Sequence, residues 1–361
     1  MPQLYERGTG TEPSTLADLL DERSQPGTLV LPAEEGSVRC VACGHRCLIR
    51  PGRRGICKVR FNRQGVLYVP HGYVAGIQCD PIEKKPFFHV RPGRDALTFG
   101  MLGCDLHCDY CQNWLTSQAL RDPEAGVSPA SVSADDVVAL ARRYGADVVA
   151  SSYNEPLITA EWAVEVFQSA RRAGLLTAVV SNGNATPEVL DYLRPFTDCY
   201  KIDLKSMSDR SYRRLGGVLQ NILDGIRMVH ERGFWLEIVT LLVPGFNDAP
   251  DEIRRAAEFI ASVSPDIPWH VTAFHPDYRM RDHAGTRAEQ IVRACEIGRD
   301  AGLRFVYAGN LPGRVGQWEH TLCPDCGDAL VERTGYVVHG VRLTADGRCP
   351  TCGARIPGLW H

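Results

Sequence analysis

Three cysteines on one short loop constrain this chain more than any other feature. Cys104, Cys108 and Cys111 follow directly after the apolar run 96–101, in the segment TFGMLGCDLHCDYCQN, at C-x3-C-x2-C spacing. Three thiolates cannot by themselves close a structural zinc site or a four-thiolate iron–sulfur site, but they can hold a cluster that keeps one iron free for an outside ligand. The spacing therefore predicts an iron–sulfur cluster with an open position at the end of a buried strand.

The remaining cysteines fall mainly into two groups of four. The chain of 361 residues contains 14 cysteines, and we interpret the three ungrouped ones, Cys79, Cys199 and Cys295, as ordinary buried thiols. Because the N-terminus lacks the pattern of a secretory signal, we expect the groups to serve metals and redox chemistry rather than disulfides.

The first group of four lies near the N-terminus. Glycines and prolines separate its members at C-x2-C-x3-C-x9-C spacing, and these are Cys40, Cys43, Cys47 and Cys57. Four thiolates would satisfy zinc, or would fully ligate a second 4Fe-4S cluster, and His45 could replace one thiolate in either case. We expect zinc here, with the second cluster and an unliganded irregular loop as the alternatives.

The second group of four lies near the C-terminus, in two C-P-x-C-G knuckles. Its members are Cys323, Cys326, Cys349 and Cys352. Each knuckle turns on its glycine, and four thiolates close a tetrahedral site with no open position, so the pattern predicts a structural zinc ribbon. A ribbon that reads nucleic acid is disfavoured because the segment lacks a concentrated stripe of Lys and Arg with aromatics.

Between the two groups, strand-like runs alternate with helical patterns. We expect strands at 96–101, 147–152, 176–181, 199–203, 235–242, 269–274 and 304–307. We expect helices at 134–144, 157–173, 187–194, 219–232, 250–262 and 286–301, with starts marked by Ser133 with Asp136 and by Thr186 with Pro187. This alternation predicts parallel βα units in a partial (β/α)6 barrel of the α/β class. Upstream, the runs 66–69 and 71–77 predict a small hairpin.

Polar residues follow the predicted strands one after another. They include Tyr153-Asn154-Glu155-Pro156, Asn182-Gly183-Asn184, Asp203-Leu204-Lys205 and His275-Pro276-Asp277. Ligands gather at the carboxyl ends of parallel strands, so these residues and the cysteine loop are expected around one site.

Composition narrows the class of protein. A hydrophobic content of 44% and a net charge of −3 indicate a globular chain without the basic field that nucleic-acid binding needs. No apolar run approaches the length of a membrane span, and we expect a cytoplasmic protein. The predicted domains are an N-terminal arm at 1–36 with a short helix after Ser14, a Cys-rich metal-binding segment at 37–95, the barrel at 96–317 and the ribbon at 318–361.

Over residues 37–361 the chain resembles the radical S-adenosylmethionine (SAM) enzymes of the AmmeMemoRadiSam system, which are related to pyruvate formate-lyase activating enzymes. The segments that carry the resemblance are CVACGHRC, GCDLHCDYCQN, SYNEP, KIDLK, LVPGFND, WHVTAFHPDY, YAGNLPG and the terminal EHTLCPDCG and CPTCGARIPG. The resemblance implies a 4Fe-4S cluster on Cys104, Cys108 and Cys111 that cleaves SAM to a 5′-deoxyadenosyl radical, which abstracts hydrogen from a protein or peptide. It also implies an electron donor such as a flavodoxin or ferredoxin, and Memo-like and AMMECR1-like proteins as partners.

The resemblance further implies a set of SAM contacts. Tyr110 matches the aromatic that orients the adenine, and the family's Gly-Gly-Glu-Pro motif aligns with 153–156, where Tyr153 and Asn154 replace both glycines. The other residues that match contact positions are Asn154, Glu155, Ser181, Asn182, Asp203, Lys205 and His275. Two alternative functions are a glycyl-radical enzyme activase and a non-catalytic iron–sulfur and zinc protein that binds RNA or protein partners.

Overall fold

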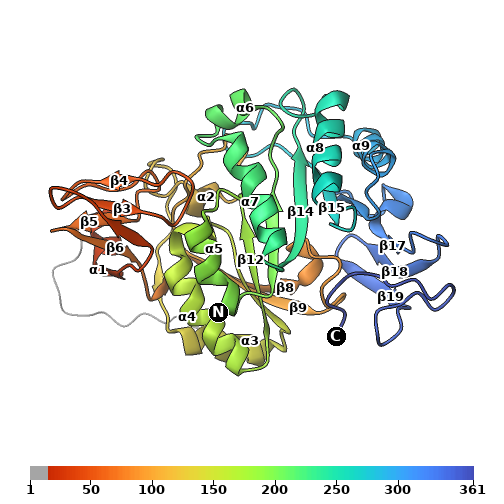
Figure 1. The fold of residues 1–361 in the computed structure, drawn as a ribbon, viewed down its shortest axis with the longest axis horizontal. Coiled ribbons are helices and arrows are strands. Elements are labelled where there is room, and N and C mark those ends of the chain that lie inside the picture. The colour runs from red at the N-terminus through yellow and green to blue at the C-terminus, as the bar shows by residue number, and fades with distance from the viewer. Residues whose placement is uncertain (1–14) are drawn as a thin grey trace.

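An eight-stranded sheet forms the centre of the computed structural model, which describes residues 15–361 (Figure 1). The strand order is β16-β15-β14-β13-β12-β11-β9-β8, and every pair from β9 to β16 is parallel. The bounds are β8 (Gly76–Pro81), β9 (Asp95–Gly100), β11 (Val148–Ser151), β12 (Leu176–Ser181), β13 (Cys199–Asp203), β14 (Trp235–Leu242), β15 (Trp269–Ala273) and β16 (Val306–Gly309). The predicted partial barrel of the α/β class is therefore confirmed.

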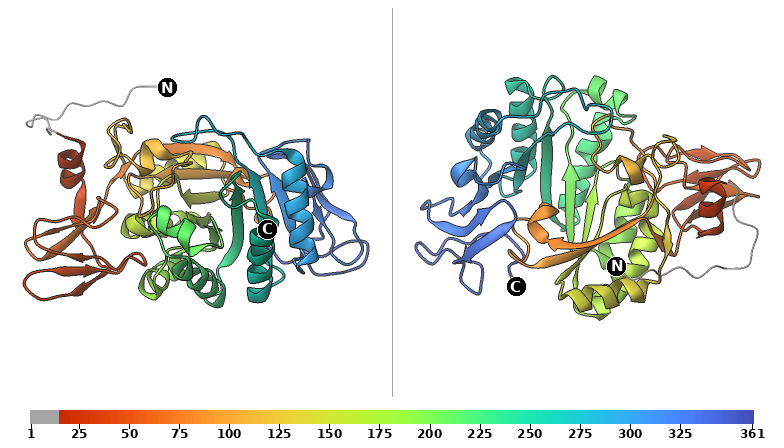
Figure 2. Two further views of the ribbon diagram at one scale, coloured as in Figure 1. Left: turned by 90° about the horizontal axis from the view of Figure 1, so that it is seen from above. Right: turned by 180° about the vertical axis from the view of Figure 1, so that it is seen from behind.

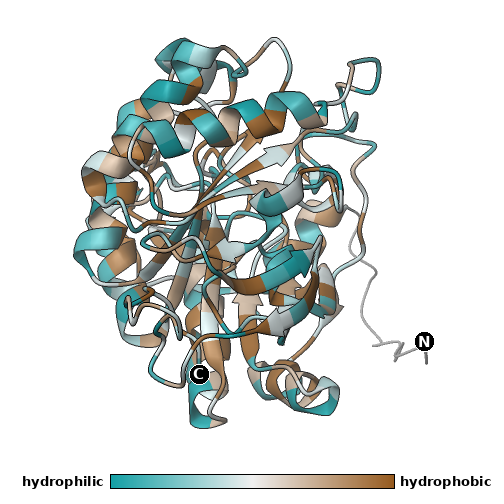
Figure 3. Cartoon of the chain, turned by 90° about the vertical axis from the view of Figure 1, so that its right-hand side faces the viewer, coloured by the Kyte–Doolittle hydropathy of each residue, from teal (hydrophilic) through white to brown (hydrophobic). Residues whose placement is uncertain are grey.

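The helices of the βα units lie on the outside of the sheet (Figure 2). They are α3 (Ala134–Tyr144), α4 (Ala160–Arg172), α5 (Pro187–Leu193), α6 (Asp209–Arg214), α7 (Leu219–Glu231), α8 (Pro250–Val263) and α9 (Ala288–Asp300). Apolar and polar residues alternate along them in Figure 3, as expected for helices with one face on a core. The two predicted helix starts are confirmed, since Ser133 forms a capping box with Asp136 and Thr186 caps α5. No helix within the described residues is long and apolar enough to cross a membrane.

The two faces of the sheet carry different side chains because successive residues of a strand point to opposite sides. Leu97, Val149 and Phe167 belong to the large core between sheet and helices. Small inward-facing residues, among them Ala96 and Ala150, form a second core with Phe87. This inner core fills the barrel at the amino ends of the strands, so free space is left at the carboxyl ends.

The predicted hairpin at 66–77 is wrong. The segment instead divides among three sheets: β6 (Val66–Pro70) pairs with β5 (Phe61–Arg63), β7 (Tyr73–Val74) pairs with β10 (Ala130–Ser131), and β8 pairs antiparallel with β9. The connection from β8 to β9 spans only residues 82–94. It contains only the short 3₁₀ helix Ile82–Lys84 and no α-helix that crosses over the sheet, and the two strands pair antiparallel.

The N-terminal segment forms two small sheets at one end of the molecule, opposite the C-terminal ribbon (Figures 1 and 2). The elements are α1 (Leu16–Glu22), β1 (Ser24–Pro26), β2 (Val30–Pro32), β3 (Val38–Cys40) and β4 (Leu48–Ile49). Strand β1 pairs with β6 and β2 with β3, so residues 24–32 are built into the Cys-rich segment. Thr15 caps α1, and the predicted cap Ser14 lies outside the described residues.

The ribbon closes the open side of the barrel. Its strands are β17 (Thr321–Leu322), β18 (Ala329–Thr334) and β19 (Val337–Val341). The buried Arg333 of β18 donates to the carbonyl of Phe88 at 2.7 Å and to Thr321 Oγ1 at 2.8 Å. Its guanidinium also lies 4.3 Å from the centre of the Phe88 ring. Arg333 therefore joins the ribbon to the segment that follows the edge strand β8.

The buried His89, which lies between the ribbon and β16, makes the free energy of unfolding depend on pH. His89 Nδ1 lies 2.6 Å from the Pro357 carbonyl oxygen and Nε2 lies 2.6 Å from Tyr307 Oη, and burial lowers the His89 pKa from 6.5 to about 4. The stability that depends on neutral His89 is complete above pH 6.5 and is lost as the pH falls toward 4. We expect the free energy of unfolding to drop by about 2 kcal/mol between about pH 7 and about pH 5 through this group.

Urea denaturation of the full chain at the two pH values measures this drop. The His89→Gln variant keeps polar atoms in place but cannot titrate, so its drop is expected to be smaller by about the same 2 kcal/mol. Equal drops in the two proteins would show that other groups carry the pH dependence.

Candidate active site at the carboxyl ends of the strands

A cavity of about 360 Å³ opens at the carboxyl ends of the parallel strands. Five of the predicted site residues line it, namely Cys108, Tyr110, Cys111, Asp203 and Lys205. The other walls come from the segment after β8, the inner faces of β15 and β16, and the ribbon residues Gly335 and Tyr336. The cysteine loop and the polar ends of the strands therefore share one space.

The cysteine loop is held by hydrogen bonds to its own sulfurs. The Leu106 N–H donates to Cys104 Sγ at 3.4 Å, and Cys111 Sγ lies 3.2 Å from Ser117 Oγ. Gly103 begins the loop with a φ of +95°, a left-handed conformation that a side chain would strain. Donors facing sulfur favour its thiolate form, which is the form that binds metal.

A buried carboxylate ties this loop to the end of β12. Asp105 is fully buried and accepts hydrogen bonds from Asn182 Nδ2 at 2.6 Å and from Asn184 Nδ2 at 2.8 Å. Asn182 Nδ2 also lies 3.9 Å from Cys104 Sγ. The Asn182 side chain therefore contacts the cysteine loop directly. Asp105 was not predicted as a site residue, because its role depends on contacts with residues far away in the sequence.

Glu155 accepts hydrogen bonds from the same end of β12. Its carboxylate accepts from Ser181 Oγ at 2.7 Å, from the Asn182 N–H at 2.8 Å and from the Leu157 N–H at 3.1 Å. Burial, together with the charge of Asp105, raises the Glu155 pKa to about 8. Within the described chain, Glu155, Ser181 and Asn182 are not among the cavity-lining residues. The three are brought together as a buried network beside the cavity.

Asn154 also turns inward. Its Oδ1 accepts from the Met101 N–H at 3.0 Å, which fixes the end of β9 where the cysteine loop begins. The preceding Tyr153 has a φ of +68° and lies on the cavity wall, with Lys85 Nζ 3.1 Å from its hydroxyl. A side chain at Gly100 would come within 2.7 Å of the Tyr153 Cβ, so the glycine leaves room for this tyrosine.

The end of β13 carries a compact group of charges. Asp203 pairs with Lys201 and, at 3.2 Å from its Oδ2, with Lys205 Nζ. Burial alone would raise the Asp203 pKa, but the two cations lower it to about 2. Burial would lower the Lys205 pKa, whereas Asp203 raises it well above its usual value. Asp203 and Lys205 therefore stay ionised at the cavity wall.

His275 lies apart from the other predicted residues. It is exposed, and its Nε2 lies 2.7 Å from Gln112 Nε2 of the cysteine loop. Gln112 lines the cavity, but His275 is not among the lining residues in the described chain. The structure thus places His275 at the rim.

The cavity residues that were not predicted from the sequence include Lys85, Lys201, His270 and Tyr336. The alternation of strand side chains would have found Lys201, two residues before Asp203, and His270, two before Thr272. His270 Nε2 lies 2.6 Å from Glu237 Oε2, and burial lowers the His270 pKa. Lys85 and Tyr336 come from segments outside the barrel, and no local pattern marks them.

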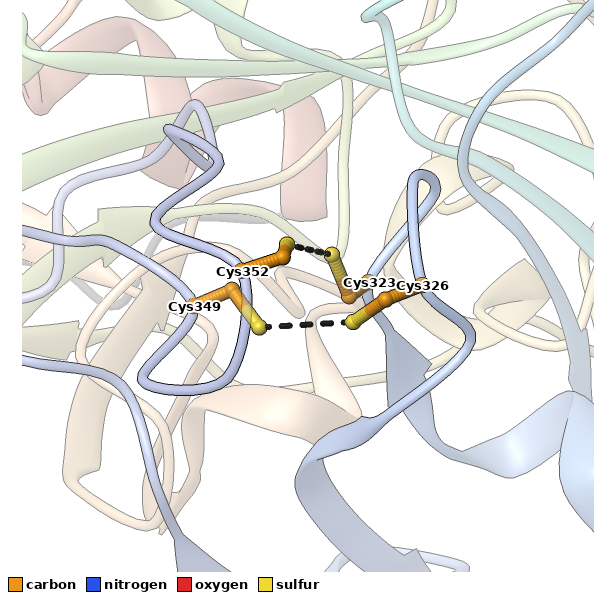
Figure 4. Close-up of side chains that lie close together, drawn as sticks. All are labelled: Cys323, Cys326, Cys349 and Cys352. Atoms are coloured by element: carbon orange, nitrogen blue, oxygen red, sulfur yellow. Dashed lines mark hydrogen bonds between the residues drawn. The ribbon is translucent and has the colours of Figure 1, made fainter.

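The cysteines of the ribbon gather more tightly than those of the loop. Cys323 Sγ lies 3.5 Å from Cys352 Sγ, and Cys326 Sγ lies 3.6 Å from Cys349 Sγ (Figure 4). All four sulfurs lie within 4.8 Å of one another. Four thiolates about 2.3 Å from a central ion have this spacing, so the geometry fits one tetrahedral metal ion.

The amide of Asn182 offers a test of the buried network. Asn182→Ala removes a donor from the buried Asp105 carboxylate, and we expect the free energy of unfolding to fall by about 1.5–3 kcal/mol. Asn221→Ala is the matched control, because Asn221 is only partly buried and its amide contacts are 3.4 and 3.5 Å long. Its expected effect is within about 0.5 kcal/mol. If urea denaturation shows equal losses of unfolding free energy in the two variants, the hydrogen bond from Asn182 to Asp105 does not stabilise the fold as proposed.

Comparison with known proteins places this cavity in a family context. The model of the radical SAM superfamily matches residues 99–260, which include the cysteine loop and the ends of β11 to β14. An uncharacterized protein of Methanocaldococcus jannaschii is 33% identical over 326 residues, covering 90% of this chain and 96% of that protein.

Relatives with described activities match the barrel region. The pyruvate formate-lyase 1-activating enzyme of Escherichia coli K12 is 28% identical over 171 residues, covering 46% of this chain and 69% of the enzyme. A crystal structure of a domain of pyruvate-formate lyase-activating enzyme from Bacteroides vulgatus shares 26% identity at a TM-score of 0.40, covering 45% of this chain and 98% of that domain.

Proposed function

Because this chain belongs to the radical SAM superfamily and is a SAM-dependent enzyme, we propose that it cleaves SAM reductively and uses the product radical to abstract hydrogen from a protein or peptide. The observation that carries the proposal is the position of Cys108 and Cys111 on the wall of a cavity that also presents Asp203 and Lys205. A cluster at that wall would direct its open iron into the space where a substrate binds.

The residues around the loop fit a 4Fe-4S cluster held by Cys104, Cys108 and Cys111. The sulfurs of Cys104 and Cys111 face protein hydrogen-bond donors. Burial raises the pKa of the Cys108 thiol, and the Lys205 cation opposes that rise. Donors and a cation stabilise the negative charge of metal-bound thiolates. When bound, the cluster and SAM supply a 5′-deoxyadenosyl radical by one-electron cleavage of SAM.

The protein's own contribution is to bind and orient SAM and to keep water away from the reacting atoms. The Asp203 and Lys205 side chains can pair with the ammonium and carboxylate of SAM, and Tyr110 offers an aromatic face on the same wall. The buried network of Asn154, Glu155, Ser181 and Asn182 positions the cysteine loop and the end of β12. His275 reaches the site from the rim through Gln112.

A protein or peptide substrate is supported by the similarity to activating enzymes. We assign the chain to the AmmeMemoRadiSam group, with Memo-like and AMMECR1-like proteins as partners and a flavodoxin or ferredoxin as electron donor. The same similarity favours one second candidate, a glycyl-radical enzyme activase, which requires a partner enzyme with an accessible glycine loop. Detection of a glycyl radical on a co-purified partner would distinguish the activase.

We also propose structural zinc for the ribbon, since four thiolates around one ion leave no open position. Residues 318–361 would then be a separate ribbon domain after the barrel at 96–317. The N-terminal strands β1 and β2 pair with strands of the Cys-rich segment, and we therefore treat residues 15–95 as one unit.

Removing one cluster ligand tests the proposed activity. We expect Cys104→Ala to reduce 5′-deoxyadenosine formation from SAM to background under anaerobic reducing conditions, because two thiolates cannot hold the cluster with one open iron. Chromatographic assay of 5′-deoxyadenosine measures this loss. Cys295→Ala is the matched control, since Cys295 is buried in α9 away from the cysteine groups. Continued cleavage by Cys104→Ala would refute the ligand assignment.

Removing a ribbon cysteine should act on stability first. We expect Cys323→Ser to lose about one zinc per chain and to lower the melting temperature, because metal binding and folding of such a site are coupled. Zinc analysis and thermal unfolding measure both effects. Cys79→Ser, a half-buried cysteine of β8, is expected to keep the zinc. An unchanged zinc content in Cys323→Ser would contradict the zinc assignment.

A further inference from the structure

The N-terminal cysteine quartet forms a second thiol site beside the cysteine loop. Cys40, Cys43 and Cys57 are buried and Cys47 is half-buried. The Cys40 N–H donates to the Cys47 carbonyl oxygen at 2.9 Å, and a side chain at Gly55 would lie 3.7 Å from Cys47 Sγ. Burial raises the pKa values of Cys43, Cys47 and Cys57, and the charge of Cys40 raises each further. The four thiols therefore lie close enough to interact electrostatically within the segment 40–57.

The sulfurs of the N-terminal quartet are not gathered around one point as those of the ribbon are. Within residues 15–361, the ribbon quartet is the one group of three or more Cys, His, Asp or Glu side chains whose ligand atoms all lie within 4.8 Å of one another. The loop triplet Cys104, Cys108 and Cys111 is spread like the N-terminal quartet. A 4Fe-4S cluster places each thiolate on a different iron and so holds the sulfurs farther apart than a single zinc ion does. In the described residues the N-terminal quartet and the cysteine loop thus share a looser arrangement than the ribbon quartet.

A buried cation stands beside the quartet. Arg60 is 1% exposed and forms hydrogen bonds of 2.7 and 2.8 Å to Glu161, while its Nε has no hydrogen-bond partner among the described residues. Burial would lower the Arg60 pKa, but the charges of Cys40 and Glu161 raise it. Arg60 Nη1 also donates to the Ile158 carbonyl oxygen at 3.1 Å, and the link between its guanidinium and the quartet is electrostatic, through Cys40. This environment suits an anionic metal–thiolate centre.

The quartet packs directly against the cysteine loop. His45 Nε2 lies 3.9 Å from Asp105 Oδ2, and the Gly44 N–H donates to the Asn184 carbonyl oxygen at 2.8 Å. A side chain at Gly103 would come within 3.2 Å of the Cys57 carbonyl oxygen. Burial raises the pKa values of Cys43 and Cys47 on one side of Asp105 and of Cys104 on the other, and the negative charge of Asp105 raises all three further. The N-terminal quartet and the cysteine loop therefore meet through Asp105, Asn184 and the backbone at Gly103.

We propose that Cys40, Cys43, Cys47 and Cys57 hold a second, fully ligated 4Fe-4S cluster, in place of the zinc expected from sequence, and that it relays electrons to the cluster on Cys104, Cys108 and Cys111. An outside one-electron donor of low potential, such as a reduced flavin or iron–sulfur protein, reduces the second cluster. The second cluster passes that electron to the cluster on Cys104, Cys108 and Cys111 and so returns to its oxidised state. The protein therefore takes up one electron for each SAM molecule that it cleaves. The proposed electron relay rests on the proposed SAM cleavage, whereas the presence of the second cluster is independent of it.

Metal analysis of anaerobically purified full-length protein tests the second cluster. We expect about eight iron atoms and about one zinc per chain. A content of about four iron atoms and about two zinc ions would overturn the proposal.

A triple variant separates this inference from the proposed function. Cys104→Ala/Cys108→Ala/Cys111→Ala is expected to keep about four iron atoms and to give, after dithionite reduction, an electron paramagnetic resonance signal that SAM does not change. Loss of all iron from a folded variant would overturn the second cluster. If the wild type itself holds only about four iron atoms and the variant keeps them, the second cluster stands and the proposed function fails.

The relay has its own measurement. Cys43→Ala/Cys47→Ala should lose about four iron atoms and cleave SAM at least about tenfold more slowly than wild type with reduced flavodoxin, yet still cleave it with dithionite, a small reductant that can reach the first cluster directly. Cys79→Ser is the matched control and should keep both rates. Equal rates with flavodoxin in the double variant and the wild type would overturn the relay.

Discussion

The buried carboxylate of Asp105 holds the functional part of this molecule together. It follows Cys104 in the chain and accepts strong hydrogen bonds from Asn182 and Asn184 at the end of β12. A fully buried carboxylate needs such donors, because an unpaired one would cost several kcal/mol. Its contacts therefore fix the cysteine loop on the barrel and bring the N-terminal quartet, through His45, against the same point.

The cavity depends on parts of the chain that are far apart in sequence. The sheet ends at β16 and β8 and does not close on itself. The ribbon connects the two sides, because Arg333 binds the Phe88 carbonyl beyond β8 and Thr321 binds the Tyr307 hydroxyl of β16. The ribbon also places Tyr336 on the cavity wall. Folding of the ribbon therefore also completes the wall of the site, which links stability at the C-terminus to the shape of the cavity.

Much of the architecture followed from local patterns. The strands β12, β13 and β14 begin and end where the apolar runs predicted, and the capping pairs at Ser133 and Thr186 mark real helix starts. The predicted hairpin at 66–77 is wrong because alternation gives a strand but not its partner. Here β6 pairs with β5, β8 with β9, and β7 with the distant β10. Lys85 and Tyr336 were missed for the same reason, since only packing brings their segments to the site.

The sequence by itself determined the kinds of chemistry available, because thiolate number and spacing decide which metals a loop can hold and strand periodicity decides which residues share a face. It also placed Asp203 and Lys205 at one strand end. Only the tertiary structure decided what those residues touch. Glu155 and Asn154 turn into a buried network because their backbone neighbours offer donors there. The spread of the N-terminal thiols and their contact with Asp105 arise from long-range packing, which no local pattern encodes.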